Sequence, residues 1–490
     1  MKVLAIDLGA SGGRAILGEY NRSLSLTEIH RFENNPIKIN GHLYWDIKAL
    51  FNEIKTGIKN CMKLYSDVKS ICIDTWGCDF ALIDSEGNII HSPLHYRDKL
   101  TEGGVMDEVF KIIPKETLYK KTGIEFMRYN TIFQIFALKK LRPEVFQKAH
   151  KILFMPDLFG YLFTGNIACE YTIASTSGLI NLETKQPDEE ILDKLGINYS
   201  LFPQICKPGT VLGPLKSELA QKLGLEQINV ITGAGHDTAD AVTAAPLAGF
   251  DSCFISCGTW SLLGTESETP NTGNEAFECN FTNEGGYNDK ILFLKNISGL
   301  WLLQESRRQW EKEGDILSFA QIGEAVTKNT SPDVYIDVER GEFGSPGNLP
   351  ALFNEYFKST GQKQLSNKID ITQCILESLA LSYDYRIRQL EQITDKEFSA
   401  INIIGGGVQD RNLMQYTANA TGKVIITGPV EATALGNIII QLICAGAVKD
   451  VEEARAKITG IVTYLPQTDN RKTWNQKRDK YTKLKNTGNG

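Results

Sequence analysis

The sequence predicts an α/β fold built from two related domains with a cleft between them. Its 490 residues exceed what one ordinary hydrophobic core holds, so we expect two domains, or three. Apolar, strand-like runs that end in glycine turns recur along the chain in two matching sets. The order of the predicted elements also restarts after residue 250, which indicates a duplicated α/β unit.

The glycine turns match in pairs. Residues 3–14 and 253–260 each pass from an apolar strand into a glycine turn, and residues 228–237 and 401–410 share a second pattern. A fifth segment, residues 71–77, stands alone. Glycine at a strand end lets backbone amides approach an anion closely. The repetition therefore indicates a nucleotide held between the two halves.

The first half begins with a strand at 2–7 and its hairpin partner at 13–20. A helix follows Asp46, the expected N-cap, because apolar residues from Ile47 to Cys61 repeat at helical spacing. The remaining elements expected in this half are a strand at 70–74, a hairpin of strands 80–83 and 88–90, mostly helical chain over 100–225 with a helix at 131–141, a strand at 228–231 and a helix at 238–245.

The best candidate for a domain boundary is the segment 245–250, where the composition changes. We therefore expect domains at 1–246 and 247–490. The elements expected in the second half are two strands joined by a glycine turn within 253–265, a helix at 371–390, a strand, a triple glycine and a helix within 401–418, a strand at 423–427, an apolar helix at 431–442 and a last helix at 471–485.

Composition excludes several classes of protein. The net charge is −7, whereas a nucleic-acid-binding protein needs a basic face, and we interpret the basic stretch 471–485 as a solvated helix. The ten cysteines show no Cys-x-x-Cys or zinc spacing, and as small core residues they suit a reducing cytosol. The most apolar stretch, 438–448, is too short to cross a bilayer. We expect a cytoplasmic protein with neither nucleic acid nor a membrane as partner.

The loop Gly9–Arg14 is a candidate phosphate-binding loop, since its glycines and Ser11 can direct backbone amides at a phosphate chain. Asp7, at the end of the preceding strand, is a candidate for holding Mg²⁺ directly or through water. The alternative is a plain hairpin with a solvent-facing Asp7. The turns at 258–259 and 405–407 are further anion-binding candidates, and the alternative for 405–407 is a tight strand-to-helix turn. The sequence contains no P-loop and no protein-kinase motif set.

Asp237 follows an apolar strand and precedes a helix, where a carboxylate can accept the proton of a substrate hydroxyl during phosphoryl transfer. His236 and Thr238 are candidates for binding neighbouring hydroxyls, and the alternative for Asp237 is a helix N-cap. The segment Asp74–Asp79 is a candidate sugar site, in which Trp76 offers an apolar face and aspartates accept from hydroxyls. The alternative is a core tryptophan.

The segment Lys295–Gln304 is expected to begin a helix with polar groups near its start. Asn296 is a candidate for contact with the substrate, and Gln304 is a candidate for contact with a nucleotide. The alternative for Gln304 is an ordinary surface glutamine.

Together these segments resemble the FGGY carbohydrate kinases, a family of the actin-like ATPase superfamily, through almost the whole chain. The Thr-Trp-Gly-x-Asp-Phe run at 75–80 and the Leu-Trp-Leu-Leu-Gln run at 300–304 are most similar to the branch of that family that acts on L-rhamnulose. They separate the chain from the glycerol and xylulose kinases. Further stretches that carry the resemblance are 7–14, 30–32, 96–98, 170–172, 236–238, 258–261, 282–286, 294–296 and 428–437.

The resemblance implies two actin-like, ribonuclease H-like domains, each a mixed sheet flanked by helices. The first is expected to bind the sugar and to carry the catalytic base Asp237, and the second is expected mainly to bind the nucleotide. The substrate-binding positions implied in this way are Gly77, His236, Asp237, Thr238 and Asn296. The ATP-binding positions are Ala10, Ser11, Gly12, Gly13, Arg14, Thr259, Gln304 and Gly406. Gly12 and Cys257 stand where relatives often have serine, and we expect little loss because backbone amides make most phosphate contacts.

The implied reaction transfers the γ-phosphoryl group of ATP, with Mg²⁺ as cofactor, to the 1-hydroxyl of L-rhamnulose in L-rhamnose catabolism. The expected partners are ATP and L-rhamnulose, and the expected state is a monomer or small homo-oligomer. Two alternatives stay open. One is a kinase of the same family for another ketose, such as L-fuculose or L-xylulose. The other is an actin-like ATPase switch without a sugar substrate.

Overall fold

The computed structural model describes residues 1–225, 228–247 and 252–487 of the chain. They form two compact units, each assembled from separate stretches of sequence. Unit 1 contains Met1–Ala244, Glu266–Phe293 and Ala432–Lys457, and unit 2 contains Ala245–Thr265, Leu294–Glu431 and Ile458–Gly490. The domain boundary expected after residue 246 stays a prediction, and residues 248–250 of the segment that motivated it lie outside the described residues.

The bounds of the elements are as follows. Up to residue 243 they are β1 (Lys2–Gly9), β2 (Gly12–Asn21), β3 (Ser23–Glu33), β4 (Ile37–Ile39), β5 (His42–Tyr44), α1 (Ile47–Leu64), β6 (Val68–Thr75), β7 (Phe80–Ile83), β8 (Ile89–His91), η1 (Lys99–Thr101), α2 (Val105–Ile112), α3 (Lys115–Thr122), α4 (Thr131–Leu141), α5 (Pro143–Lys148), β9 (Lys151–Phe154), α6 (Met155–Thr164), β10 (Cys169–Glu170), α7 (Tyr171–Ser175), α8 (Glu189–Leu195), η2 (Tyr199–Leu201), β11 (Ile205–Cys206), β12 (Val211–Pro214), α9 (Ser217–Leu223), β13 (Asn229–His236) and α10 (Asp237–Thr243). From residue 252 they are β14 (Ser252–Cys257), β15 (Trp260–Ser267), α11 (Asn274–Glu278), β16 (Thr282–Gly285), η3 (Tyr287–Asp289), β17 (Ile291–Ser298), α12 (Trp301–Lys312), α13 (Phe319–Lys328), η4 (Gly341–Gly344), α14 (Leu349–Ser359), α15 (Lys368–Thr394), β18 (Ala400–Ile404), η5 (Gly406–Gln409), α16 (Arg411–Thr421), β19 (Val424–Thr427), α17 (Ala432–Cys444), α18 (Val451–Arg455), β20 (Val462–Tyr464), η6 (Thr468–Asn470) and α19 (Arg471–Thr487).

The large sheet of unit 1 has the strand order β12-β13-β6-β1-β2-β3. β6 lies parallel to both β1 and β13, whereas β2 is antiparallel to β1 and β3, and β12 is antiparallel to β13. The sheet is therefore mixed, as predicted. Ile73 packs in one core with residues of α1 and α6, while the next residue, Asp74, accepts a hydrogen bond from Asn437 of α17. Successive strand residues face opposite sides, so helices cover both faces of the sheet.

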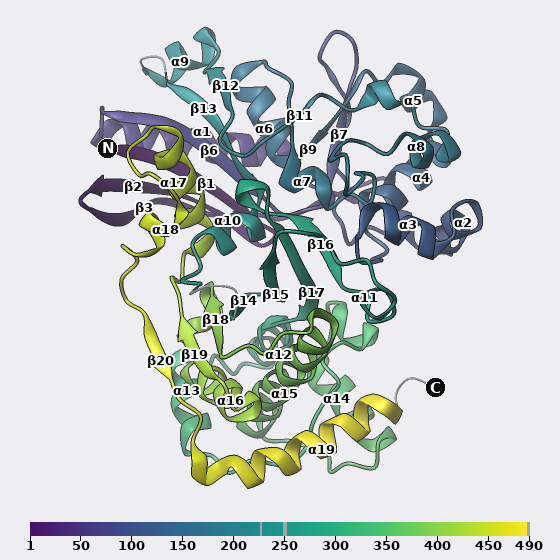
Figure 1. Cartoon of the computed structure of the whole chain (residues 1–490), viewed down its shortest axis with the longest axis vertical. Coiled ribbons are helices and arrows are strands. Elements are labelled where there is room, and N and C mark those ends of the chain that lie inside the picture. The colour runs from purple at the N-terminus through teal and green to yellow at the C-terminus, as the bar shows by residue number, and fades with distance from the viewer. Residues whose placement is uncertain (226–227, 248–251, 488–490) are drawn as a thin grey trace. The chain divides into compact units, whose positions relative to one another are not determined.

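Helix α17 lies against strands that are far from it in sequence. It packs on β1 and β6, and Figure 1 shows this late segment beside the N-terminal strands. Gln441 Nε2 donates to the carbonyl of Leu4 over 3.1 Å, and Ser70 Oγ donates to Gln441 Oε1 over 2.6 Å. A Cβ on Gly436 would overlap the carbonyl oxygen of Asp240, so only glycine permits this close approach of α17 to α10.

The second large sheet has the order β16-β17-β15-β14-β18-β19-β20. β14 is antiparallel to β15 and parallel to β18, β18 is parallel to β19, and β19 is antiparallel to β20. The same directions relate β1 to β2 and β6, β6 to β13, and β13 to β12. The repeated topology confirms the predicted duplication and the predicted α/β fold class.

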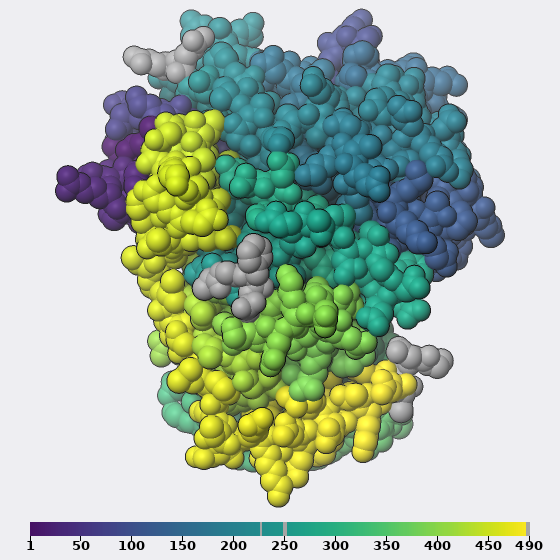
Figure 2. Space-filling model, viewed as in Figure 1, coloured from purple at the N-terminus to yellow at the C-terminus, as the bar shows by residue number. Residues whose placement is uncertain are grey.

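The last helix, α19, covers α15 and α16 within unit 2 and is visible along the surface of that unit in Figure 2. The predicted helix at 471–485 is thus confirmed, but it is not simply solvated. Trp474 and Tyr481 are 4% and 1% exposed, and Lys477 Nζ lies 2.7 Å from Glu377 Oε1. One face of this basic helix belongs to the core, because its aromatic residues recur at helical spacing.

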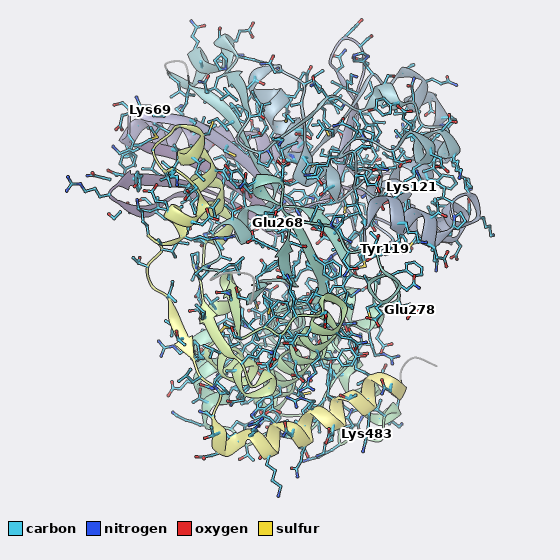
Figure 3. The ribbon with its side chains drawn as sticks, viewed as in Figure 1. Lys69, Tyr119, Lys121, Glu268, Glu278 and Lys483 are labelled. Atoms are coloured by element: carbon cyan, nitrogen blue, oxygen red, sulfur yellow. The ribbon has the colours of Figure 1, made fainter. Side chains whose placement is uncertain are left out.

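A smaller part of unit 1 combines the sheet β8-β7-β9 with α2 to α5 and α8 around its own apolar cluster. Tyr119 on α3 belongs to this part (Figure 3). Its hydroxyl donates to the carbonyl of Phe281 over 2.8 Å, which joins α3 to the segment before β16.

Several elements agree with the sequence-based predictions, among them the β1–β2 hairpin, β6, α4, α15 and α1, whose N-cap Asp46 accepts from the backbone of Ala49. The prediction that Lys295–Gln304 begins a helix is wrong in its first part. Residues 295–298 end strand β17, and α12 begins at Trp301. Strand pairing in the sheet overrides the helical pattern of the local sequence there.

The described part of the chain contains cysteines as free thiols. None of its helices combines the length and apolar character that crossing a membrane requires.

Candidate active site

The β1–β2 hairpin holds the predicted phosphate loop. Gly9 pairs with Gly12 across the two strands, so Ala10 and Ser11 form a tight two-residue turn. Gly12, Gly13 and Arg14 are the first residues of β2. The predicted hairpin is therefore confirmed, and the exposed Ser11 stands at its tip, whereas the phosphate-binding role of the loop stays a prediction.

Asp7 lies inside the sheet and is only 2% exposed, so the alternative of a solvent-facing Asp7 is wrong. Its register partners are Arg14 on β2 and Asp74 on β6, and residues in register point to the same face. Arg14 Nε lies 3.1 Å from Asp7 Oδ2. Burial, followed by the negative charge of Asp7, raises the pKa of the Asp74 carboxyl well above its ordinary value. This face of the sheet thus gathers two carboxyls and one guanidinium.

Asp237 is the first residue of α10, and its side chain is 29% exposed. The N-cap of α10 is His236, so the alternative role of Asp237 as an N-cap is wrong. Thr238 Oγ1 donates to Asp237 Oδ1 over 3.2 Å. Burial raises the pKa of Asp237 to about 6, against the opposing effects of Thr238 hydrogen bonds and the charge of Arg14. A carboxylate with this pKa is mostly ionised at pH 7 and is well matched to accepting a proton.

His236 lies between two carboxyl groups at the end of β13. Its Nδ1 lies 3.3 Å from Glu284 Oε2, and its Nε2 lies 3.5 Å from Asp237 Oδ1. His236 and Glu284 are 7% and 6% exposed. Burial lowers the pKa of the His236 imidazole and raises the pKa of Glu284, while the charge of each partner opposes the shift. The imidazole is therefore neutral at pH 7.

The short helix α7 fixes the end of β13. Its N-cap, Glu170, is buried and accepts hydrogen bonds from Thr172 Oγ1 over 2.6 Å and from the backbone N–H of Gly235 over 2.9 Å. Thr172 Oγ1 in turn accepts from the backbone N–H of His236 over 3.2 Å. The backbone that presents His236 and Asp237 is therefore held by a buried network.

Gly77 lies near the same strand end. Thr75 is the register partner of His236 across β6 and β13, and a Cβ on Gly77 would lie 3.1 Å from Thr176 Oγ1. The next residue, Cys78, has a φ of +78°, a left-handed conformation that costs energy for any residue except glycine. Unit 1 therefore brings Gly77, His236, Asp237 and Thr238 to one region.

Trp76 is a core tryptophan, the alternative to a sugar-facing one. It is 6% exposed, and its Nε1 donates to Asp79 Oδ2 over 2.9 Å. Trp45, 1% exposed, donates to the same oxygen over 2.6 Å, and Gln134 Nε2 donates to Asp79 Oδ1 over 2.9 Å. Burial raises the pKa of Asp79 to about 7 although these three side chains oppose the shift. Trp45 and Trp76 thus fix Asp79 and stabilise the turn around Gly77 by hydrogen bonding from the core.

In unit 2, the turn between β14 and β15 contacts the start of α12. Thr259 Oγ1 donates to Gln304 Oε1 over 3.3 Å. The backbone N–H of Leu300 donates to the Gly258 carbonyl over 2.9 Å, and that of Trp301 donates to the Thr259 carbonyl over 3.1 Å. Two predicted nucleotide residues, Thr259 and Gln304, are therefore brought into contact, and Gln304 is not an isolated surface glutamine.

The triple glycine lies beside this turn. Gly405 has a φ of +86°, and a Cβ on Gly407 would overlap the Cys257 side chain at the end of β14. Gly406, by contrast, faces open space, where a Cβ would meet no atom within 4 Å. Asn296, the predicted substrate residue of unit 2, lies on β17. Unit 2 therefore gathers Thr259, Gln304 and Gly406 around two glycine turns.

Within the described residues, no group of three or more histidine, cysteine, aspartate or glutamate side chains is arranged to hold a metal ion. Mg²⁺ in phosphoryl-transfer enzymes commonly takes one or two carboxylates and completes its shell with water and phosphate oxygens. The buried oxygen donors of Asp7 fit that limited requirement.

The family model for the N-terminal domain of the FGGY family of carbohydrate kinases matches residues 2–244, and the model for the C-terminal domain matches residues 253–445. A rhamnulokinase of Halalkalibacterium halodurans is 44% identical over 455 residues, covering 93% of this chain and 96% of the relative. A rhamnulokinase of Bacillus subtilis is 38% identical over 473 residues, covering 96% of each.

Two solved structures share the fold. A xylulose kinase from Lactobacillus acidophilus superimposes with a TM-score of 0.83 at 18% identity, over 99% of this chain and 98% of that one. A gluconate kinase from the same species has a TM-score of 0.82, also at 18% identity and with the same coverage. The chain is a phosphotransferase that acts on an alcohol group. It belongs to the FGGY family of carbohydrate kinases.

Sequence reasoning assigned no role to Glu284 or Glu170. Both lie in stretches that carry the family resemblance, Glu284 in 282–286 and Glu170 in 170–172. The signal that could have identified them is a carboxylate directly before Gly-Gly in the first case and directly before Tyr-Thr in the second. Their significance depends on packing against β13, which no local pattern reveals.

Proposed function

We propose that this enzyme transfers the γ-phosphoryl group of ATP to the 1-hydroxyl of L-rhamnulose and serves L-rhamnose catabolism. The relatives named rhamnulokinase, matched over nearly their whole length, support this choice of ketose. The observation that carries the chemistry is the Asp237 carboxylate, partly exposed and with a pKa of about 6.

Asp237 acts as the general base. It takes the proton of the 1-hydroxyl as that oxygen forms a bond to the γ-phosphorus, while the bond from phosphorus to the β,γ-bridging oxygen breaks. The products are L-rhamnulose 1-phosphate, ADP and the proton held on Asp237. Thr238 and Arg14 keep the carboxylate ionised before the transfer, since both lower its pKa.

The proposed sugar-binding residues are Gly77, His236, Thr238 and Asn296. The buried turn around Gly77 and the fixed end of β13 support this role in unit 1. For Asn296, which lies on β17 in unit 2, the family resemblance is the support.

The proposed ATP-binding residues are Ala10, Ser11, Gly12, Gly13 and Arg14 in unit 1, and Thr259, Gln304 and Gly406 in unit 2. The exposed hairpin tip and the open space at Gly406 suit phosphate and adenosine contacts. Mg²⁺, held by Asp7 directly or through water, supplies neutralisation of phosphate charge when bound.

A coupled ADP-release assay with L-rhamnulose, L-fuculose and L-xylulose, with and without Mg²⁺, tests the proposal. We expect the highest kcat/KM with L-rhamnulose. A higher kcat/KM with another ketose would identify that ketose as the preferred substrate instead. A rate of ATP hydrolysis that does not change when any of the sugars is added would favour a switch ATPase.

Asp237→Asn tests the base. The variant should keep its fold and ATP affinity but lose about 10²- to 10⁴-fold in kcat, because the amide accepts no proton. Asp289→Asn, at an exposed surface carboxylate, is the matched control. A wild-type kcat in Asp237→Asn would show that Asp237 is not the general base.

We also propose that the enzyme is cytoplasmic and a monomer or small homo-oligomer. The free thiols of the described chain support a reducing compartment. Light scattering of the purified enzyme measures the oligomeric state.

A further inference from the structure

The buried pair of His236 and Glu284 takes no part in the proton transfer proposed above, although it adjoins Asp237. His236 Nδ1 lies 3.3 Å from Glu284 Oε2, and both residues are less than one tenth exposed. Besides His236, the groups that act electrostatically on Glu284 are Glu125, Asp237 and the hydroxyl of Thr282. Neither His236 Nδ1 nor Glu284 Oε2 has a hydrogen-bond partner among the described residues, and a buried polar atom left unpaired costs free energy.

The two residues are held in place by the same short helix. The backbone N–H of His236 donates to Thr172 Oγ1 over 3.2 Å, and the backbone N–H of Gly285, next to Glu284, donates to Ser175 Oγ over 2.8 Å. Both hydroxyls belong to α7. The separation of imidazole and carboxyl is therefore set by a rigid local frame.

The frame determines which ring nitrogen carries the proton. A neutral imidazole has one donor nitrogen and one acceptor nitrogen. A proton on Nδ1 would let the two unpaired atoms, which lie 3.3 Å apart, share it, and Nε2 would then present a lone pair. Nε2 lies 3.5 Å from Asp237 Oδ1, and two acceptors side by side suit a hydroxyl-rich ligand.

We propose that Glu284 is a positioning residue that keeps the His236 proton on Nδ1, so that Nε2 accepts a hydrogen bond from a sugar hydroxyl beside the one that Asp237 deprotonates. The proposal rests on the proposed sugar-kinase function and adds a requirement to it. The preferred substrates present a second donating hydroxyl near the phosphorylated one, which for a 2-ketose is the 2-hydroxyl of the cyclic hemiketal form or the 3-hydroxyl.

The direct test is ¹⁵N NMR of the histidine rings in the full-length enzyme, which has six histidines. Comparison with His236→Gln identifies the signal of His236. In the wild type, and in Glu284→Gln, whose amide oxygen still accepts, we expect the proton on Nδ1. In Glu284→Leu no acceptor faces Nδ1, so the proton should move to Nε2, toward Asp237 Oδ1.

Kinetics give the second readout. Glu284→Leu should lose about 10- to 100-fold in kcat/KM for the ketose, mainly through KM, as expected when a hydrogen bond is lost and its buried partner is left unsatisfied. Glu284→Gln should recover most of this loss, and the Kd for ATP should stay at the wild-type value in both. Glu278→Gln, an exposed residue on α11 (Figure 3), is the matched control and should behave as wild type.

A wild-type His236 that carries its proton on Nε2, or on both nitrogens, would overturn the proposal. An unchanged tautomer and an unchanged kcat/KM in Glu284→Leu would do the same. If Glu284→Leu does not fold, the wild-type and Glu284→Gln spectra still decide. If no ketose is phosphorylated by the wild type, the proposed function fails, whereas the NMR result still decides whether Glu284 sets the tautomer.

Discussion

The acid limb of the pH–rate profile should report the ionisation of Asp237. Burial raises the pKa of Asp237 to about 6, and a general base must be deprotonated before it accepts the substrate proton. With that pKa, about 90% of the carboxyl is ionised at pH 7 and about 10% at pH 5. We therefore expect kcat/KM for L-rhamnulose, measured at saturating MgATP, to fall about tenfold between pH 7 and pH 5. A carboxyl with its ordinary pKa, near 4, would lose only about one tenth of its activity over that interval.

The charge of Arg14 provides a second check with a defined sign. Arg14 lowers the pKa of Asp237, so Arg14→Met should raise it and move the acid limb to higher pH. The assay is ADP release followed with the coupling enzymes in excess at each pH. A midpoint near pH 4, or an Arg14→Met limb that moves to lower pH, would refute the electrostatic reasoning.

Two further predictions concern the nucleotide turn and the helix contact. Thr259→Val removes the hydroxyl that contacts Gln304, and it should weaken ATP binding about 2- to 10-fold in calorimetric titration with little change in sugar affinity; the reverse order would reassign the turn. Gly436→Ala should lower the free energy of unfolding in urea by about 3 kcal/mol or more, because its Cβ would overlap the Asp240 carbonyl. Gly347→Ala, which meets open space, is the neutral control, and equal stability of the two variants would contradict the close packing.

Local patterns predicted much of the fold. The strand-to-turn segments and helix α1 were predictable because alternation, helical spacing and an Asp46 cap act within a few residues. The place of Asp237 between an apolar strand and a helix was also predictable, because it is a local feature, whereas its role as a base stays a prediction. The predicted helix at Lys295 failed because the pairing of β17 in the sheet is a long-range effect.

The candidate site was only partly predictable for the same reason. Nothing in the sequence next to Trp76 shows that its indole donates to Asp79 together with that of Trp45. Likewise, Glu284 meets His236 only after β16 is tied to α7. Residue types and motifs identify where chemistry is concentrated, whereas the partners of buried polar groups depend on the completed packing.

The late position of α17 has a consequence for synthesis of the chain on the ribosome. Until residues 432–444 emerge, the β1–β6 face lacks its cover, and Asp74 lacks the Asn437 amide that donates to it over 2.7 Å. The N-terminal half of the nascent chain must therefore wait, with apolar strands uncovered, for a segment made near the end of translation. A stop codon shortly before residue 432 should give a product that chaperones retain or proteases remove, even though every residue of the first 244 is intact.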